Sequence, residues 1–301
     1  MTLRFALAPL AFCLLLAGCF SLRDDSSRSV SLPSAAAAKA AAGQKVQNLK
    51  DKTQFSLPDT LGGVVSSDRW VVYQEREEEE FEGNVSYDGG LYAFRCDYAL
   101  SQRKKNLFTA RGNVWARKNE PQNAFYELSA DRAVYNYQTG RGEASARKGK
   151  NIELTYQNAQ GALTRAFAQR AEFDVKERVY RLIGGARVVY TAADGQQITL
   201  RAQQITAREK DNYAVLEGGA EVNNGKYSLR AQTLEYDGNN RRVYAHGSRP
   251  LAQGKTEDGT FAIIADKADT ETDSRKIHLS GGVQGWVVSE QVNASKANRT
   301  F

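Results

Sequence analysis

A skeleton of alternating apolar and polar positions recurs along the chain, and it is clearest from Ile198 to Val222. This stretch is typical of two strands joined by a polar turn, and within it the small residue Ala202 precedes Gly218 by sixteen positions. The same offset joins Cys96 to Gly112, Ala168 to Gly184, Ala231 to Gly247 and Ala265 to Gly281, while Ala130 has Ala146 in the place of the glycine. Self-similarity at a period of roughly 20–50 residues indicates a solenoid or a related array, so we expect a repeat-built protein.

The parity of the apolar positions predicts which side chains face inward. Positions at even distances from the small anchor residue of each unit are mostly apolar, whereas the odd positions carry residues such as Arg187, Glu217 and His246. Successive residues of a strand face opposite sides, so the even positions should share one interior face. Three positions after the anchor, an odd distance, the residue is again apolar, as at Ile205 and Leu234. Such a shift requires a bulge or a bend, so each unit is expected to turn a corner near its anchor.

Polar turns separate the strands, and no window shows a sustained helical period. The expected turns are 102–106, 138–140, 176–178, 209–212, 237–240 and 272–275. Residues 151–164 and 250–258 are expected to form longer excursions from the repeat, and residues 289–301 a polar C-terminal tail that frays. The pattern predicts an all-β, antiparallel domain over residues 61–288.

The composition excludes wholesale disorder, since 41% of the 301 residues are hydrophobic and 10% are aromatic. The formal net charge of +6 is spread over many residues and is not concentrated in one basic block. A solvated strand surface explains this excess, and attraction to anionic lipid or nucleic acid is the alternative. We expect no nucleic-acid partner.

Residues 1–19 are typical of a bacterial targeting segment. Arg4 supplies a positive start, and an apolar stretch from 5 to 16 follows that is too short to span a membrane. The segment ends Leu-Ala-Gly-Cys at Cys19 and resembles the lipobox, in which the cysteine is lipidated and becomes the first residue of the mature protein. The alternative is an ordinary signal peptide with an incidental cysteine. Residues 20–60, rich in Ser and Ala, are expected to form a flexible tether.

The resemblance to the lipobox also implies a location. Phe20 follows Cys19, and not the Asp that retains lipoproteins in the inner membrane of enterobacteria. The expected position is therefore the periplasm, with a lipid anchor in the outer membrane.

Residue patterns for catalysis are almost absent. His246 and His278 lie on separate units, and neither has a companion Cys or His at metal-ligand spacing. The chain contains neither a Gly-x-Ser-x-Gly elbow nor a phosphate-binding Gly-x-x-x-x-Gly-Lys loop. The acidic run 77–80 fits a cation site or a solvated turn, and Cys96 is interpreted as a packed substitute for Ala. We expect no enzymatic activity, no metal and no cofactor.

The repeated strand–Ala–turn–strand–Gly-Gly-x-Val pattern, clearest in 200–222 and 263–283, resembles the OstA-like, LptA-type family of lipopolysaccharide transport proteins. The resemblance covers roughly residues 63–288. It implies an open, V-shaped, solenoid-like β-jelly roll of two antiparallel sheets. Its apolar interior would receive the acyl chains of lipopolysaccharide, and members join other envelope transport proteins end to end through strand edges.

The residues themselves favour an interior with spare room, because inward positions such as Ala110, Ala214 and Ala220 are small. Large opposing residues such as Tyr180 and Phe173 could instead close the gap. The expected lipid-binding groove comprises Leu182, Val188, Leu200, Leu216, Val222, Leu229, Tyr236, Ile263, Leu279 and Val283.

Three classes of function are compatible with this pattern. The first is non-enzymatic binding and transfer of lipopolysaccharide or a related glycolipid. The second is a structural or protein-interaction lipoprotein that acts as a β-repeat spacer without binding lipid. The third is a polysaccharide-active enzyme, which requires clustered carboxylates that the even positions do not supply.

Overall fold

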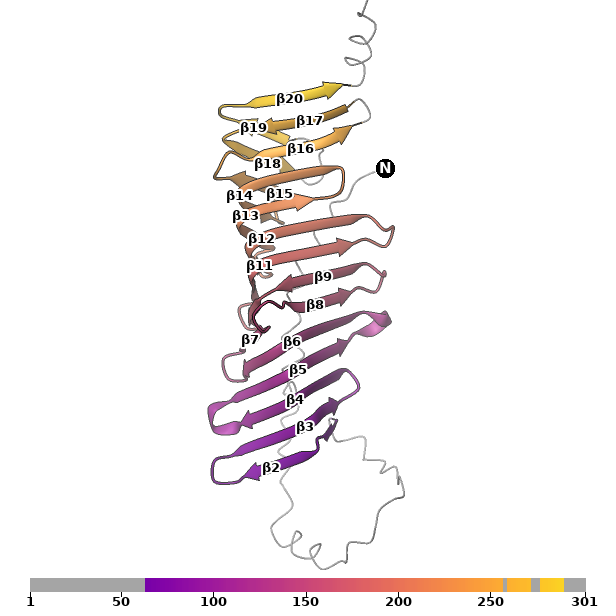
Figure 1. Ribbon diagram of the computed structural model, residues 1–301, viewed down its shortest axis with the longest axis vertical. Helices are drawn as coiled ribbons and strands as arrows, with labels where there is room; N and C mark the ends of the chain where they lie inside the picture. The colour runs from indigo at the N-terminus through magenta and orange to yellow at the C-terminus, as the bar shows by residue number, and fades with distance from the viewer. Residues whose placement is uncertain (1–62, 257–258, 272–276, 290–301) are drawn as a thin grey trace, which may run out of the picture.

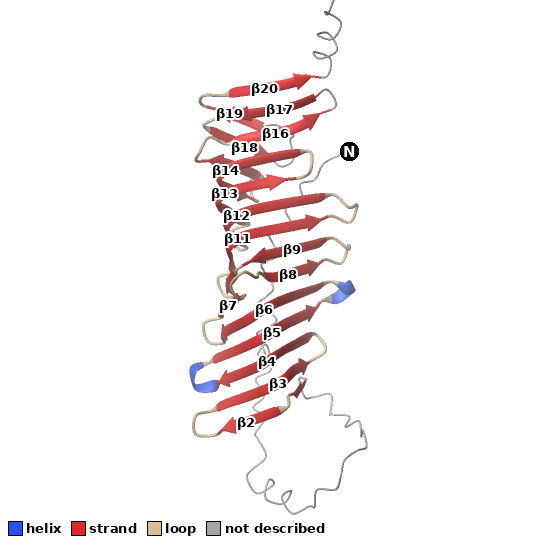
Figure 2. Cartoon of the chain, viewed as in Figure 1, coloured by secondary structure: helices blue, strands red, loops and turns tan. Residues whose placement is uncertain are grey.

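The computed structural model describes residues 63–256, 259–271 and 277–289. Strands stack into one long ladder that rises from β2 at the lower end of Figure 1 to β20 at the upper end. Figure 2 shows strands throughout, broken only by loops and by two short 3-10 turns, η2 (Arg103–Lys105) and η3 (Pro121–Asn123). The all-β, antiparallel fold expected from the sequence is confirmed. The predicted signal segment, the tether, the turn at 272–275 and the tail from residue 290 lie outside the described residues.

Twenty antiparallel strands form the ladder within the described residues. They are β1 (Val64–Ser66), β2 (Arg69–Tyr73), β3 (Glu78–Asp88), β4 (Tyr92–Gln102), β5 (Leu107–Asn119), β6 (Phe125–Asn136), β7 (Arg141–Ser145), β8 (Ile152–Gln157), β9 (Leu163–Ala168), β10 (Arg170–Asp174), β11 (Val179–Thr191), β12 (Gln197–Arg208), β13 (Tyr213–Asn223), β14 (Tyr227–Asp237), β15 (Arg242–His246), β16 (Leu251–Thr256), β17 (Gly259–Ile264), β18 (Lys267–Glu271), β19 (Ile277–Ser280) and β20 (Gln284–Ser289). The predicted turns that fall on described residues all lie between strands, at or within two residues of the expected positions.

The ladder has two layers because the long strands bend in the middle. The first half of β6 pairs with β8 and its second half with β7, while β11 pairs with β10 and β9 in the same divided manner. At the other end of the stack, β14 pairs with β16 and then with β15. Layer A therefore contains β2, β7, β10, β15, β18, β19 and the halves of long strands next to them. Layer B contains β1, β8, β9, β16, β17, β20 and the remaining halves.

The bends are bulges at the predicted corners. Pairing between β12 and β13 shifts after Arg201, and pairing between β13 and β14 shifts after Glu217. Gly218 and Gly219 lie in the second gap with φ of 82° and 77°. Glycine adopts such angles without strain, so Gly218 and Gly219 let β13 pass from one layer to the other.

Two expectations need correction. Residues 151–164 and 250–258 are not excursions, because most of them form β8, the start of β9, and β16. The reason is that β7 and β15 end at the corner, so a new strand must continue layer B. The acidic run is likewise only partly a turn, because Glu78–Glu80 already belong to β3 and only Glu77, with a positive φ, lies in the turn.

Inward residues of both layers form one hydrophobic cluster. Its largest fully buried side chains include Leu128 and Leu154 from layer B and Leu182 and Ile205 from layer A. Alanines fill much of the row beside the corner in layer A, from Ala99 to Ala171 along neighbouring strands. Small side chains here allow the two layers to approach closely where they join.

Candidate functional site

The inward apolar side chains of the two layers form rows that follow the ladder, and the inner face made by these rows is called the trough below. On layer B, cross-strand pairing places Val222 opposite Leu229, Leu229 opposite Ala252, and Ala252 opposite Ile263. On layer A, Ala268 lies opposite Leu279. Directly opposite residues of antiparallel strands lie on the same face, so these side chains form continuous apolar rows.

Exposure along the trough is uneven. Four predicted groove residues are closed into the core, with Leu182, Val188, Leu200 and Leu216 exposed by 1%, 4%, 3% and 3%. Five are only partly buried, namely Val222, Leu229, Tyr236, Ile263 and Leu279. The remaining one, Val283, lies in the bend before β20, is 50% exposed and stands outside the rows. The trough is therefore closed in the middle of the ladder. From Val222 at the end of β13 onward, partly exposed inward residues alternate with buried ones such as Leu234 and Ala252, and this stretch is the open part of the trough.

Aromatic side chains close the middle of the trough. The ring of Tyr135 stacks on Phe173 at 6.1 Å between centroids, and both are almost fully buried on layer A. Tyr126 stacks on Tyr156 at 4.4 Å on layer B, and burial raises the pKa of Tyr126, with its hydrogen bond to Tyr156 adding to the effect. Such pairs fill space that small residues alone would leave.

The open end has less cover over its inward face. Tyr227 and Phe261 flank Gly254 with their centroids 6.2 Å apart, and Tyr227 is 43% exposed. Val287, which is paired with Phe261 on the terminal strand β20, is 76% exposed. The C-terminal third thus presents apolar side chains that no described part of the chain covers.

Charged side chains near the open end lie on the opposite face of the strands. Glu221 accepts a hydrogen bond from Arg230 at 3.0 Å, and Arg201 lies 3.8 Å from the same carboxylate. Val222 and Leu229, the neighbours of Glu221 and Arg230 in the sequence, point to the interior because side chains alternate along a strand. The face that could hold a guest is apolar, and its reverse face is ion-paired.

Large apolar residues also gather at both ends of the ladder. They are Val64, Val65, Trp70 and Val72 on the first strands, and Ile277, Val283, Trp286, Val287 and Val288 on or beside the last ones. Within the described chain β1 and β2 pair only with β3, β19 only with β18, and β20 only with β17. Each terminal strand therefore leaves one edge of backbone groups without a strand partner in the described residues.

No group of three or more His, Cys, Asp or Glu residues is placed to hold a metal ion in the described part of the chain. His246 lies 2.7 Å from Glu235, whose pKa is lowered mainly by the hydrogen bond from Tyr213. Burial raises the pKa of the Cys96 thiol to about 12, so this cysteine is a core residue without a reactive thiolate.

The partners of the corner glycines were not predicted from the sequence. One position after each anchor stands an Asp or a Gln: Asp97, Asp131, Gln169, Gln203, Gln232 and Asp266. Five of these side chains lie against the glycine fifteen positions later, and the sixth, Asp131, accepts hydrogen bonds from the backbone and side chain of Arg147, the neighbour of Ala146. The fixed spacing and the restricted choice of residue were the signal that could have revealed them.

No protein-family model matches the chain, and no curated protein is similar to it in sequence. Among solved structures, it is similar to LptH of Pseudomonas aeruginosa, described as the LptA-homologous periplasmic component of the lipopolysaccharide transport device. The match covers 52% of this chain and 82% of LptH, with 14% identity and a TM-score of 0.22. Among the described residues, none forms a helix long and apolar enough to cross a membrane.

Proposed function

We propose that this protein binds lipopolysaccharide or a related glycolipid without chemistry of its own, holding the acyl chains in the open part of the trough. The observation that carries the proposal is the partly exposed apolar row formed by Val222, Leu229 and Ile263 on layer B. Each methylene that leaves water for this row contributes about 0.8 kcal/mol, and a long acyl chain supplies enough methylenes to offset the cost of association.

The apolar row also limits the guest's chemistry. Its side chains offer dispersion contacts and few hydrogen bonds, which suits hydrocarbon and not a polar solute. In this proposal the protein supplies no energy for transfer of the glycolipid, so directional movement of the glycolipid depends on another component.

The proposed setting is the periplasm, with Cys19 lipidated and anchored in the outer membrane. The terminal strands β2, β19 and β20 would then meet other envelope transport proteins by strand addition, a mode that joins backbone groups and covers exposed apolar side chains. Trp70 and Val287 are suited to such contacts because each is more than half exposed at an end of the ladder.

The second candidate function is a β-repeat spacer that binds no lipid. The closed middle of the trough favours it, because Leu182 and Leu216 are sealed by the protein's own side chains. A guest that occupied the whole length would have to part this core, so the glycolipid proposal concerns the stretch from Val222, at the end of β13, to β20.

A matched pair of substitutions on β17 tests the proposal. Ile263 faces the trough and Ile264 faces outward, and both are partly buried. Ile263→Glu should weaken binding of lipopolysaccharide at least about tenfold, because acyl chains would have to desolvate a carboxylate, whereas Ile264→Glu should leave it unchanged. Isothermal titration with purified lipopolysaccharide measures both affinities. Equal effects of the two variants, or no binding by the unaltered protein, would favour the spacer.

A further inference from the structure

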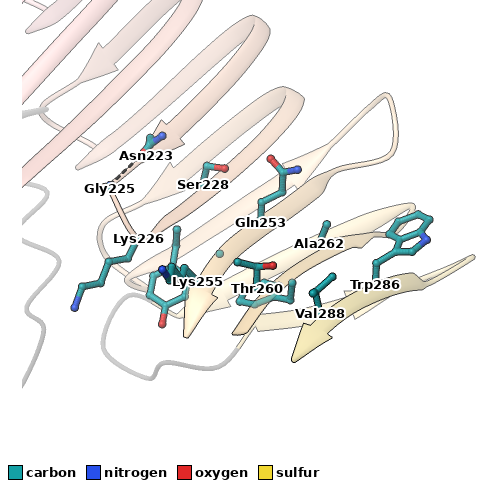
Figure 3. A pocket seen from close by; sticks show the side chains of 13 residues that line it. Asn223, Gly225, Lys226, Ser228, Gln253, Lys255, Thr260, Ala262, Trp286 and Val288 are labelled. Carbon is teal, nitrogen blue, oxygen red and sulfur yellow. Dashed lines mark hydrogen bonds between the residues drawn. The ribbon is translucent and has the colours of Figure 1, made fainter. Parts of the chain in front are cut away.

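A second hollow lies on the outer face of layer B, behind the open end of the trough. Its volume is about 400 Å³. Cross-strand pairing sets Ser228, Gln253, Ala262 and Trp286 in one row across β14, β16, β17 and β20, and Figure 3 shows these side chains along one side of the strands. The row spans three strand spacings, or about 14 Å.

The row combines a flat apolar surface with hydrogen-bonding groups. Trp286 is 56% exposed at one end, Ala262 makes a low floor beside it, and Gln253 and Ser228 offer an amide and a hydroxyl at the other end. A purely apolar ligand would leave the amide and hydroxyl without partners. A sugar ring satisfies both parts, because its C–H face lies on an indole while its hydroxyls exchange hydrogen bonds with amides and hydroxyls.

Two lysines border the same hollow and give it a charge preference. The Lys255 amide donates a hydrogen bond to the Lys226 carbonyl at 3.0 Å, which places Lys226, in the bend just before β14, beside Lys255 on β16. Among the described residues, no carboxylate lies within salt-bridge distance of either ammonium group. Two like charges held next to each other repel, and a bound anion relieves that repulsion.

From this geometry we infer that the outer hollow binds an anionic oligosaccharide, with one sugar ring on Trp286 and a phosphate or carboxylate group beside Lys226 and Lys255. The inference goes beyond the proposed function, because the hollow and the trough are on opposite faces of the same strands. It stands whether or not the trough takes acyl chains.

The test uses a ligand without hydrocarbon. The probe is the phosphorylated oligosaccharide released from lipopolysaccharide by mild acid, and maltohexaose is the neutral comparison; isothermal titration calorimetry measures both. The full chain should bind the phosphorylated probe at least about tenfold more tightly than maltohexaose. Trp286→Ala and the double variant Lys226→Ser/Lys255→Ser should each weaken probe binding at least about tenfold.

Matched controls separate the hollow from general effects. Trp70→Ala removes a tryptophan that is also 56% exposed, and Lys148→Ser/Lys150→Ser removes the same amount of charge from exposed positions; both should bind like the unaltered chain. Glu257→Gln/Asp258→Asn removes the acidic residues nearest Lys255 in the sequence and should leave binding equal or tighter. Ile263→Glu should also retain the oligosaccharide, so a failure of lipid binding is distinguishable from a failure here.

Several results would overturn the inference. The first two are the absence of probe binding and equal affinity for the probe and for maltohexaose. The third is a loss of probe binding in Trp70→Ala or Lys148→Ser/Lys150→Ser as large as the loss in the hollow variants. The fourth is a loss of probe binding in Glu257→Gln/Asp258→Asn.

Discussion

Gln203 lies directly over Gly218 at the corner shared by β12 and β13. A Cβ atom at Gly218 would come within 2.7 Å of the Cβ of Gln203, a separation that real side chains do not tolerate. The same relationship joins Gln169 to Gly184 and Gln232 to Gly247. In each of these units, the residue just after the anchor covers a glycine that lies sixteen positions after the anchor. This contact explains the sixteen-residue spacing seen in the sequence. The periodicity has a steric cause.

This contact predicts unequal costs for two neighbouring glycines. Gly218→Ala should lower the free energy of unfolding by about 2–4 kcal/mol, because it adds a clash with Gln203 to the strain of a positive φ. Gly219 has a φ of 77°, but a Cβ atom there would meet no atom within 4 Å. Gly219→Ala should therefore lower the free energy of unfolding by only about 1–2 kcal/mol. Urea unfolding of both variants measures the difference, and equal losses would contradict the steric account.

A pH-dependent contribution is expected from the outer face of layer A. Glu235 accepts a hydrogen bond from Tyr213, and this bond holds the pKa of the carboxyl below its usual value. The pKa of Glu235 is lower in the folded protein than in the unfolded chain, where it is about 4.3. The hydrogen bond therefore stabilises the fold fully above the unfolded-state pKa, and this stabilisation is lost as the pH falls through the folded-state pKa.

Tyr213→Phe should therefore destabilise the protein by about 1 kcal/mol at pH 7, with the gap to the unaltered protein narrowing as the pH falls below about 4. Denaturant unfolding across that range measures the gap. Tyr227→Phe is the control and should have little effect, because the Tyr227 hydroxyl forms no hydrogen bond with the described residues and its side chain is 43% exposed. A gap for Tyr213→Phe that stays constant down to pH 3 would argue against this role for Glu235.

The thiol of Cys96 should be inert in the folded protein. In a chain that begins at residue 20, it is the only cysteine. With a pKa of about 12, only about one thiol in ten thousand is ionised at pH 8, and burial hinders access further. Ellman's reagent should therefore label it at least about a hundredfold more slowly in buffer than in concentrated urea. Fast labelling of the native chain would show that this corner opens.

The uneven closure of the trough predicts a difference between two leucines in one inward row of layer B. Leu128 is fully buried, so Leu128→Ala should cost about 2–5 kcal/mol through lost contacts and a cavity. Leu229 is only partly buried, so Leu229→Ala should cost about 1–2 kcal/mol. Unfolding free energies measured without lipid compare the two, and an equal cost would mean that the C-terminal end is closed in solution.

The parts of the fold that could be predicted from sequence are those with a local signature. The change of apolar parity at Ile205, together with the spacing from Ala202 to Gly218, predicted the corner, because a bulge alters the pattern within a few residues of itself. The inward direction of Leu229 and Ile263 followed from alternation alone. Each of these features depends on neighbours along one strand.

The features that were missed depend on distant segments. β8 and β16 interrupt the repeat because β7 and β15 stop at the corner, and nothing local to residues 151–164 indicates which layer needs a strand. Burial was missed for a related reason. Leu182 and Ile263 have the same inward parity, yet only Leu182 is covered from all sides by neighbouring units. Burial of this kind depends on how neighbouring units stack on a residue, and the pattern along one strand does not reveal it.

The most direct test of the central claim is photo-crosslinking at Ile263 and Ile264 in the intact chain. A photoreactive amino acid replaces one residue at a time, lipopolysaccharide is added, and the crosslinked product is identified by mass. The trough proposal predicts a lipopolysaccharide adduct through the acyl chains at position 263 and little or none at position 264. An adduct of equal yield at both positions, or none at position 263, would contradict it.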